Sequence, residues 1–172
     1  GSLFRVAVFS NLTQDHLDYH GDFENYYLAK LRLFTDFAPQ SAVINIDDPY
    51  GQRLMLDSRA KKNIRVSLGN EKADFWTSKI VLSSEGIQAR LHTPLGDYDM
   101  STPLVGTYNL HNCLGVIGAV YALGEDLGVA VKTLAAAKGA PGRLERVMPG
   151  DDYPHVFVDY AHSDDALRNV LR

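Results

Sequence analysis

The sequence predicts an α/β fold, with a mostly parallel sheet, flanking helices and a small antiparallel three-stranded subsheet. Strand-like and helix-like segments alternate over the first third of the chain, which predicts right-handed βαβ units. Three strand-like segments separated by short turns follow, and short turns predict an antiparallel meander. The chain is 45% hydrophobic and 22% charged, which is typical of a globular protein with a real core.

The first third is expected to contain three parallel strands and two helices. Asp48 followed directly by proline is a strong helix start, because it combines a capping carboxylate with a residue suited to the first helical turn. In chain order we expect a strand at Val6–Phe9, a helix from about Asp22 to Phe37, a strand at Ala42–Ile46, a helix from Pro49 to about Ser58 and a strand at Ile64–Leu68.

The remaining elements follow from turn residues and from apolar patterning. The helix expected at Thr107–Leu123 is apolar nearly all round, with Gly115 and Gly118 three residues apart, so we expect it to be buried and closely packed. The expected order is strands at Asp74–Leu82, Ile87–His92 and Tyr98–Thr102, helices at Thr107–Leu123 and from about Leu127 to Lys138 with Gly139 as the stop, a strand at Val156–Asp159 and a final helix from about Asp164.

Composition excludes several classes of protein. The formal charge of −4 argues against bulk binding of nucleic acid. No run approaches the roughly 20 apolar residues of a membrane-spanning helix, so no membrane partner is expected. The single cysteine, Cys113, lies in an apolar stretch, which rules out a disulfide framework and fits a reducing compartment.

Lys30 is the residue that folding alone explains least well. A helical wheel places it on the apolar side of its helix, between Phe23 and Phe37. A buried ammonium is costly unless it is paired or chemically altered, although a lysine stem can also run along apolar surface and release its charge into water. Just upstream lies a run of potential metal or proton ligands, namely Asp15, His16, Asp18, His20 and Asp22.

Five blocks of the sequence resemble those of the Mur ligase family, the ATP-dependent amide-forming enzymes of peptidoglycan precursor synthesis. They are SNLTQDHLDYHG with LAKLRLF, INIDDPYG, PLVGTYNLHNCLGVIGA, GAPGRLERV and VFVDYAHSDDAL, in the order that the family has. The DHLDYHG and DYAH forms most resemble the members that add the third amino acid, meso-diaminopimelate or L-lysine. The residues that decide between these two amino acids are expected beyond Arg172, so the choice stays open.

The resemblance implies two magnesium ligands. Lys30 matches the family lysine that is carbamylated and helps to hold Mg²⁺, which would replace a buried cation by an anion with hard oxygen ligands. His16 matches the histidine that ligates the same ion. Histidine is an uncommon Mg²⁺ ligand, so the residue type alone would indicate helix capping or hydrogen bonding instead.

The resemblance also implies an ATP site built from four residues. Asn109 and Asn112 match the asparagines beside the adenine; the alternatives are helix capping for the first and a core amide for the second. Arg143 matches the arginine near the nucleotide, against a surface ion pair with Glu145. Asp159 matches the acid near the ribose.

Residues 1–150 are expected to be the C-terminal part of the central ATP-binding domain, and residues 151–172 the start of the C-terminal ligase domain. The family's glycine-rich phosphate loop is not found, since no Gly-Lys dipeptide occurs. We therefore expect the N- and C-terminal parts of the same polypeptide to complete the enzyme, and this chain alone to be inactive. The implied partners are a UDP-N-acetylmuramoyl dipeptide and an amino acid, in the bacterial cytoplasm.

Two rival interpretations remain open. Folylpolyglutamate and cyanophycin synthetases share this ATPase core, although the DHLDYHG and DYAH blocks argue against them. A non-catalytic domain without a phosphate loop is the second.

Overall fold

The structure, a computed structural model, describes residues 4–12, 22–147, 154–162, 166–167 and 170. Its main feature is a six-stranded sheet whose spatial order is the chain order. The first four strands pair in parallel and the last three pair antiparallel, which confirms the predicted fold class. The strands are β1 (Val6–Phe9), β2 (Ser41–Asn45), β3 (Lys62–Ser67), β4 (Phe75–Ser83), β5 (Gly86–Thr93) and β6 (Gly96–Thr102).

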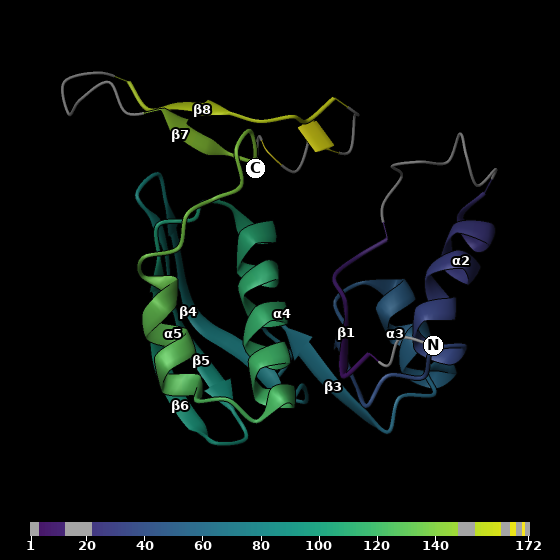
Figure 1. Cartoon of the computed structure of the whole chain (residues 1–172). Coiled ribbons are helices and arrows are strands. Elements are labelled where there is room, and N and C mark those ends of the chain that lie inside the picture. The colour runs from purple at the N-terminus through teal and green to yellow at the C-terminus, as the bar shows by residue number, and fades with distance from the viewer. Residues whose placement is uncertain (1–3, 13–21, 148–153, 163–165, 168–169, 171–172) are drawn as a thin grey trace.

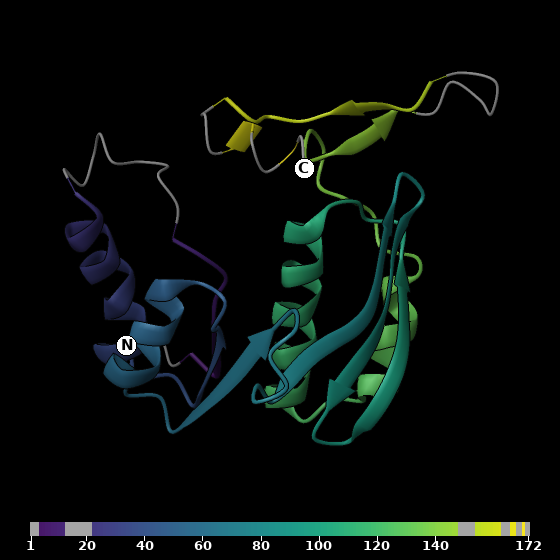
Figure 2. The same cartoon turned by 180° about the vertical axis from the view of Figure 1, so that it is seen from behind.

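Helices cover both faces of this sheet (Figures 1 and 2). Two helices pack on one side of the parallel strands, and two others pack on the opposite side, where the second of them lies against β6. The first pair is α2 (Phe23–Thr35) and α3 (Pro49–Asp57), and the second pair is α4 (Thr107–Leu123) and α5 (Leu127–Leu134). As predicted, α3 begins after Asp48, whose carboxylate caps the helix start.

The central strand β2 is buried along its whole length. Side chains alternate between the two faces of a strand, so Ala42 and Ile44 join the core under α2 and α3, whereas Val43 joins the core under α4. A continuously buried strand with an apolar centre is typical of a parallel sheet that is covered on both faces.

Two glycines let α4 approach the sheet closely. A Cβ atom added at Gly118 would lie 2.7 Å from Cγ1 of Val43, and one added at Gly115 would lie 3.2 Å from Cγ1 of Val8. The close packing predicted from the glycine spacing is therefore confirmed, and it sets the distance between α4 and β2.

The antiparallel half is continuous with the parallel half. Only Val66↔Phe75 and Ser67↔Trp76 pair between β3 and β4, after which β4 turns away and pairs with β5. The predicted meander thus extends the main sheet at its edge (Figure 2).

Two details of the prediction are wrong. The helix α5 ends at Leu134 rather than Lys138, because Leu134 is its last buried residue and the amides that follow bond to carbonyls three residues back instead of four. A short strand β7 (Glu145–Val147), missed in a charged segment, pairs antiparallel with β8 (Val156–Val158). The strand expected at 156–159 is confirmed, and residues 166–167 and 170 are helical, as expected for the final helix.

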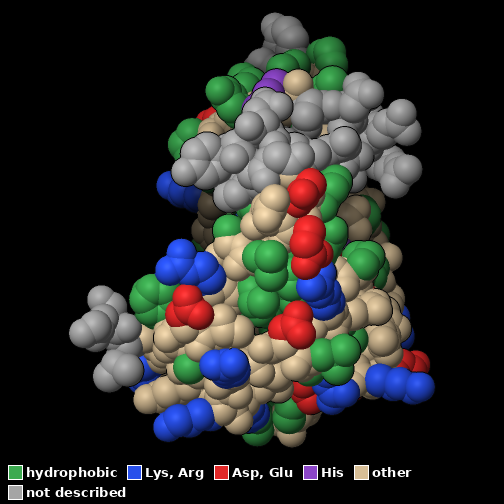
Figure 3. Space-filling view, turned by 90° about the vertical axis from the view of Figure 1, so that its right-hand side faces the viewer, with side chains coloured by type: hydrophobic (Ala, Val, Ile, Leu, Met, Phe, Trp, Pro, Cys, Tyr) green, Lys and Arg blue, Asp and Glu red, His purple; other side chains and the backbone are tan. Residues whose placement is uncertain are grey.

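The outer side of α2 and α3 carries charges of both signs. Figure 3 shows acidic and basic side chains interspersed with apolar ones on this face, and the ion pair Arg53–Glu24 joins the two helices. The face in view therefore has no continuous basic patch of the kind that binds nucleic acid. Within the described ranges, no helix is long and apolar enough to cross a membrane.

We predict that Gly118→Ala lowers the free energy of unfolding by about 1 kcal/mol. Alanine favours helix by about 1 kcal/mol over glycine, but overpacking against the stiff Val43 side chain costs about 1–3 kcal/mol. Urea unfolding measures the change. In a Val43→Ala background the same substitution should stabilise the protein, and an equal effect in both backgrounds would contradict the close-packing argument.

Candidate functional site

A cleft of about 360 Å³ opens at the carboxyl-terminal edge of the parallel strands. It lies between the loops that follow β1 and β2 and the first turns of α4. Open α/β sheets bind ligands at this edge, and the volume falls within the range of small-molecule sites. The lining residues are Ser10, Asn11, Asn45, Asp47, Asp48, Thr107, Tyr108, His111 and Asn112.

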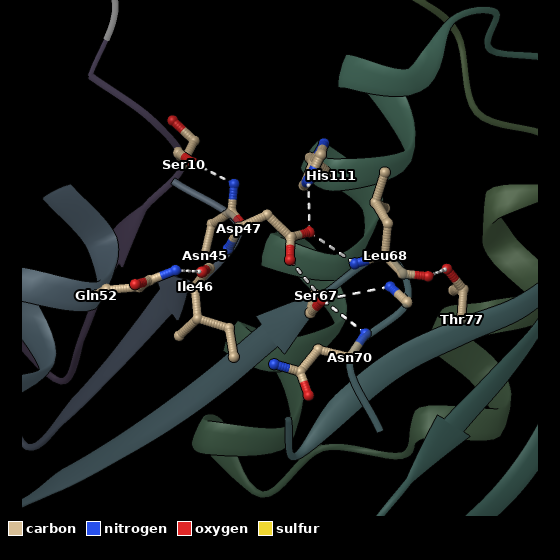
Figure 4. Close-up of polar contacts among 11 residues, drawn as sticks. Ser10, Asn45, Ile46, Asp47, Gln52, Ser67, Leu68, Asn70, Thr77 and His111 are labelled. Atoms are coloured by element: carbon tan, nitrogen blue, oxygen red, sulfur yellow. Dashed lines mark hydrogen bonds and ion pairs between the residues drawn. The ribbon is translucent and has the colours of Figure 1, made fainter. Parts of the chain in front are cut away.

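Asp47 connects three elements at this cleft (Figure 4). Its Oδ1 accepts a hydrogen bond from the Ser67 hydroxyl at 2.6 Å, and its Oδ2 accepts from the Leu68 N–H at 2.8 Å and from Nε2 of His111 at 3.0 Å. Burial alone would raise the pKa of Asp47, but the hydrogen bonds donated by His111, Ser67 and the Leu68 amide outweigh it and hold the pKa below its usual value. A charged carboxylate therefore joins the β2–α3 loop, the end of β3 and α4.

Neighbouring residues tie the loop after β1 to the same point. Nδ2 of Asn45 donates to the Ser10 carbonyl at 2.8 Å, and Oδ2 of Asp48 accepts from the Leu12 N–H at 3.1 Å. The other oxygen of Asp48 accepts from backbone amides at the start of α3. The carboxylates of Asp47 and Asp48 therefore both accept hydrogen bonds from groups that build the site.

Of the two predicted adenine-binding amides, Asn112 lines the cleft and Asn109 lies beside it. Asn109 donates to the Val105 carbonyl at 2.8 Å and accepts from Nδ2 of Asn112 at 3.3 Å. Asn112 is exposed, and its carbonyl oxygen makes no hydrogen bond with any described residue, so it is available to a ligand. The core-amide alternative does not fit Asn112, whereas a structural role does fit Asn109.

Asp159 organises one end of the β7–β8 hairpin. Its Oδ2 accepts from the Leu144 N–H and its Oδ1 from the Ala161 N–H, both at 2.7 Å. Leu144 has a positive φ of 43°, a strained conformation for a non-glycine residue, and this hydrogen bond holds it in place. Asp159 therefore fixes the loop that carries Arg143.

Arg143 is exposed and lies over the Tyr160 ring, with 5.6 Å from its guanidinium carbon to the ring centroid. Among the described residues it makes no ion pair. Glu145, its alternative partner, instead accepts from the Gly142 N–H at 2.8 Å. The guanidinium is therefore free to bind an anionic ligand.

The hairpin meets α4 at the helix start (Figure 1). A Cβ atom added at Gly106 would lie 3.1 Å from Cδ1 of Leu144 and 3.2 Å from Cε1 of Tyr108. Burial raises the pKa of Tyr108, nearby Asp159 raises it further and Arg143 lowers it, which places all three groups close together. The structure thus brings the loop of Arg143 and Asp159 to the end of α4 that carries Asn109.

The Tyr108 hydroxyl is unusual at this junction. Among the described residues it is the only buried side-chain nitrogen or oxygen without a hydrogen-bond partner. The Asn109 side chain is close enough to lower the pKa of the phenol slightly, but it does not reach hydrogen-bonding geometry. Buried polar groups without partners cost about 1–3 kcal/mol each, so this hydroxyl weakens the native fold.

The predicted magnesium ligands lie away from this cleft or outside the described residues. Lys30 is half-buried on α2, with its Nζ atom 4.8 Å from the centroid of the Tyr26 ring, and it does not line the cleft. His16, with Asp15, Asp18 and His20, lies outside the described residues. The described ranges contain no cluster of three or more His, Cys, Asp or Glu side chains suited to a metal ion.

Asp47, His111 and Tyr108 were not identified as site residues from the sequence. Two acids directly after an apolar strand could have indicated Asp47. His111 pairs with a residue 64 positions away, which no local pattern reveals.

We predict that Tyr108→Phe leaves the free energy of unfolding unchanged or slightly raised, because the lost hydroxyl has no hydrogen-bond partner in the described part of the chain. The matched variant Tyr27→Phe should lose about 1–2 kcal/mol, because the buried Tyr27 hydroxyl donates to Oδ2 of Asp57 at 2.6 Å. Urea unfolding of both variants tests this pair, and a clear loss of stability in Tyr108→Phe would show that its hydroxyl has a partner.

Comparisons with known proteins agree with this geometry. A family model described as the Mur ligase middle domain matches residues 2–120. The UDP-N-acetylmuramoyl-L-alanyl-D-glutamate--2,6-diaminopimelate ligase of Trichormus variabilis is 46% identical over 174 residues, covering 100% of this chain and 35% of that protein. The ligase of the same name from Pseudomonas aeruginosa is 42% identical over 168 residues, covering 98% and 34%. The chain thus spans about a third of the length of these curated relatives.

Solved structures give the same result. A structure of UDP-N-acetylmuramoyl-L-alanyl-D-glutamate--2,6-diaminopimelate ligase matches 97% of this chain and 34% of its own, with a TM-score of 0.82 and 35% identity. The MurF ligase of Thermotoga maritima in complex with ADP has a TM-score of 0.80 at 19% identity, over 97% of this chain and 38% of its own, and therefore shows the fold alone. Because the family model covers well over half of the chain and the architecture agrees, the chain belongs to the Mur ligase family.

Proposed function

We propose that this chain contributes the adenine and ribose side of the ATP site of a bacterial cytoplasmic ligase. The enzyme would join 2,6-diaminopimelate to UDP-N-acetylmuramoyl-L-alanyl-D-glutamate in peptidoglycan synthesis. The observation that carries the nucleotide site is the cleft at the carboxyl edge of the sheet, where Asn112 is open and the Arg143 loop lies nearby. Relatives that bear this name at 42–46% identity over nearly the whole chain support the reaction, and they favour diaminopimelate over L-lysine.

The chemistry of the lining residues suits a nucleotide. The free amide oxygen of Asn112 can accept from the exocyclic amine of adenine. The guanidinium of Arg143, which makes no ion pair with a described residue, can donate to ribose or phosphate oxygens. Asp47 and His111 hold α4 against the sheet, so that the amide is presented at a fixed position. These residues bind and orient, and positioning is a large part of catalysis in phosphoryl transfer.

In the proposed reaction, ATP transfers its γ-phosphoryl group to the D-glutamyl carboxylate, which gives an acyl phosphate and ADP. The amine nitrogen of the incoming amino acid then attacks the acyl carbon, and inorganic phosphate leaves. The phosphate loop and the residues that select the amino acid would come from other parts of the same polypeptide. Residues 1–150 would belong to its central domain, and residues 151–172 would begin the C-terminal domain.

Mg²⁺ would neutralise charge on the transferred phosphoryl group. Lys30 as a carbamate and His16 are its proposed ligands. Lys30 is half-exposed and its ammonium makes no ion pair with a described residue, so CO₂ can reach the amine. That environment fits carbamylation.

We predict that Asn112→Ala weakens ATP binding by about 2- to 10-fold in the full-length parent protein, because one hydrogen bond contributes about 0.5–1.5 kcal/mol. Isothermal titration calorimetry measures the dissociation constant. The control is Gln88→Ala, which removes an exposed amide from β5 outside the cleft and should bind ATP like wild type. A parent protein that does not bind ATP would refute the proposed function and favour a non-catalytic domain.

We predict a carbamate on Lys30 in the full-length protein with Mg²⁺ and ATP. In ¹³C NMR with labelled bicarbonate, a carbamate signal should appear and be lost in Lys30→Gln but not in Lys72→Gln. Ligase activity of Lys30→Gln should fall by at least about 10- to 100-fold, the range for disturbed metal sites. Absence of the signal in the nucleotide-bound enzyme would refute the carbamate, while leaving the adenine cleft untouched.

A further inference from the structure

His111 carries a ring nitrogen that the framework of the cleft does not use. Its Nε2 lies 3.0 Å from Oδ2 of Asp47, and Figure 4 shows the ring extending from α4 to that carboxylate. Its Nδ1 makes no hydrogen bond with any described residue and is not among the buried unpartnered atoms, so it is accessible. The side chain is 24% exposed and lines the cleft.

Asp47 determines which ring nitrogen carries the proton. A carboxylate oxygen can only accept, so Nε2 must hold the hydrogen. In the neutral imidazole the other nitrogen is then an acceptor, and the hydrogen bond to one nitrogen sets the role of the other. Two further donors, the Ser67 hydroxyl and the Leu68 N–H, keep the Asp47 carboxylate in place. The cleft therefore contains a fixed acceptor at Nδ1.

The neighbouring groups indicate which substituent of a nucleotide base this acceptor can recognise. Asn112, the next residue on α4, also presents an acceptor, its carbonyl oxygen, that no described residue occupies. The exocyclic amine of adenine has two N–H groups, whereas a 6-oxopurine has an acceptor at the same position. Two acceptors on one side of a cleft suit the amine and disfavour the oxo group, because an unmatched acceptor pair would be left without partners.

We propose that His111 is a specificity-determining residue of the nucleotide site, whose Nδ1 accepts a hydrogen bond from the 6-amino group of adenine, with Asp47 as the positioning residue that fixes its tautomer. The inference rests on the proposed nucleotide site and adds the base selectivity of that site. Asp47 does not touch the base; it acts through the ring of His111.

The test compares ATP with purine riboside triphosphate, which lacks the 6-amino group, and with inosine triphosphate, which carries a 6-oxo group. Affinities are measured calorimetrically with the full-length protein at pH 8. Wild type should prefer ATP over both analogues. In His111→Phe the preference for ATP over purine riboside triphosphate should fall by about 3-fold or more, as expected for one hydrogen bond.

Two Asp47 variants separate tautomer control from general stability. In Asp47→Asn the amide oxygen can still accept from the Leu68 N–H and from Nε2 of His111, so the tautomer stays fixed and the preference should be retained. In Asp47→Ala the tautomer is no longer fixed and the preference should fall. The control His92→Phe alters a similar imidazole, bonded to Ser78 and Asp97 on the antiparallel strands, and should bind all three nucleotides like wild type.

Several outcomes would overturn the inference. Equal wild-type affinity for ATP and purine riboside triphosphate would refute the role of His111 but not the proposed nucleotide site. An unchanged preference in His111→Phe, or an equal loss of affinity for all three nucleotides, would assign His111 a purely structural role. If Asp47→Ala does not fold, the nucleotide preferences of wild type and His111→Phe still test the inference. A wild-type protein that binds none of the three refutes the proposed function itself.

Discussion

The site depends on one partly exposed carboxylate that is hydrogen-bonded on both oxygens. Asp47 receives hydrogen bonds from the end of β3, from the amide that follows it and from α4, so a single side chain sets how the sheet edge and the helix face each other. Its charge costs desolvation energy, which these donors offset. The close approach of α4 at Gly118 works in the same direction, because it leaves the helix no freedom to move toward the sheet. The cleft exists because these two constraints act together.

Most of the fold could be predicted from local pattern. The helix start at Asp48, the largely apolar helix with Gly115 and Gly118 and the short turns of the meander each have a local physical cause that tertiary contacts reinforce. The strand at 145–147 could not be predicted, because three residues with two charges gain their pairing only from a distant partner. The end of α5 was misplaced because burial, rather than Gly139, stops that helix.

The site was predictable to a smaller extent. Motif resemblance named Asn109, Asn112, Arg143 and Asp159 as candidates, and the structure puts the hairpin loop of the last two at the start of α4, the helix that carries the first two. It did not identify the contacts that hold these residues, since Asp47–His111 and Leu144–Asp159 join separate segments of the chain. The proposed roles of Lys30 and His16 still rest on resemblance. Residue type and spacing thus indicate the chemistry of a site, whereas its support emerges only in three dimensions.

The two halves of the proposed nucleotide site, the start of α4 and the β7–β8 hairpin, are packed against the rest of the protein to different extents. The α4 half rests on the core, whereas the hairpin is held, among the described residues, mainly by Leu144 against Gly106 and by the ion pair between Arg146 and Glu85 of the β4–β5 turn. An inhibitor that anchors on the α4 half would meet a preorganised surface and lose little binding energy to ordering. An inhibitor that depends on Arg143 would also have to order the β7–β8 hairpin, which these two contacts hold in place. Compounds built outward from the purine end should therefore gain affinity with fewer atoms.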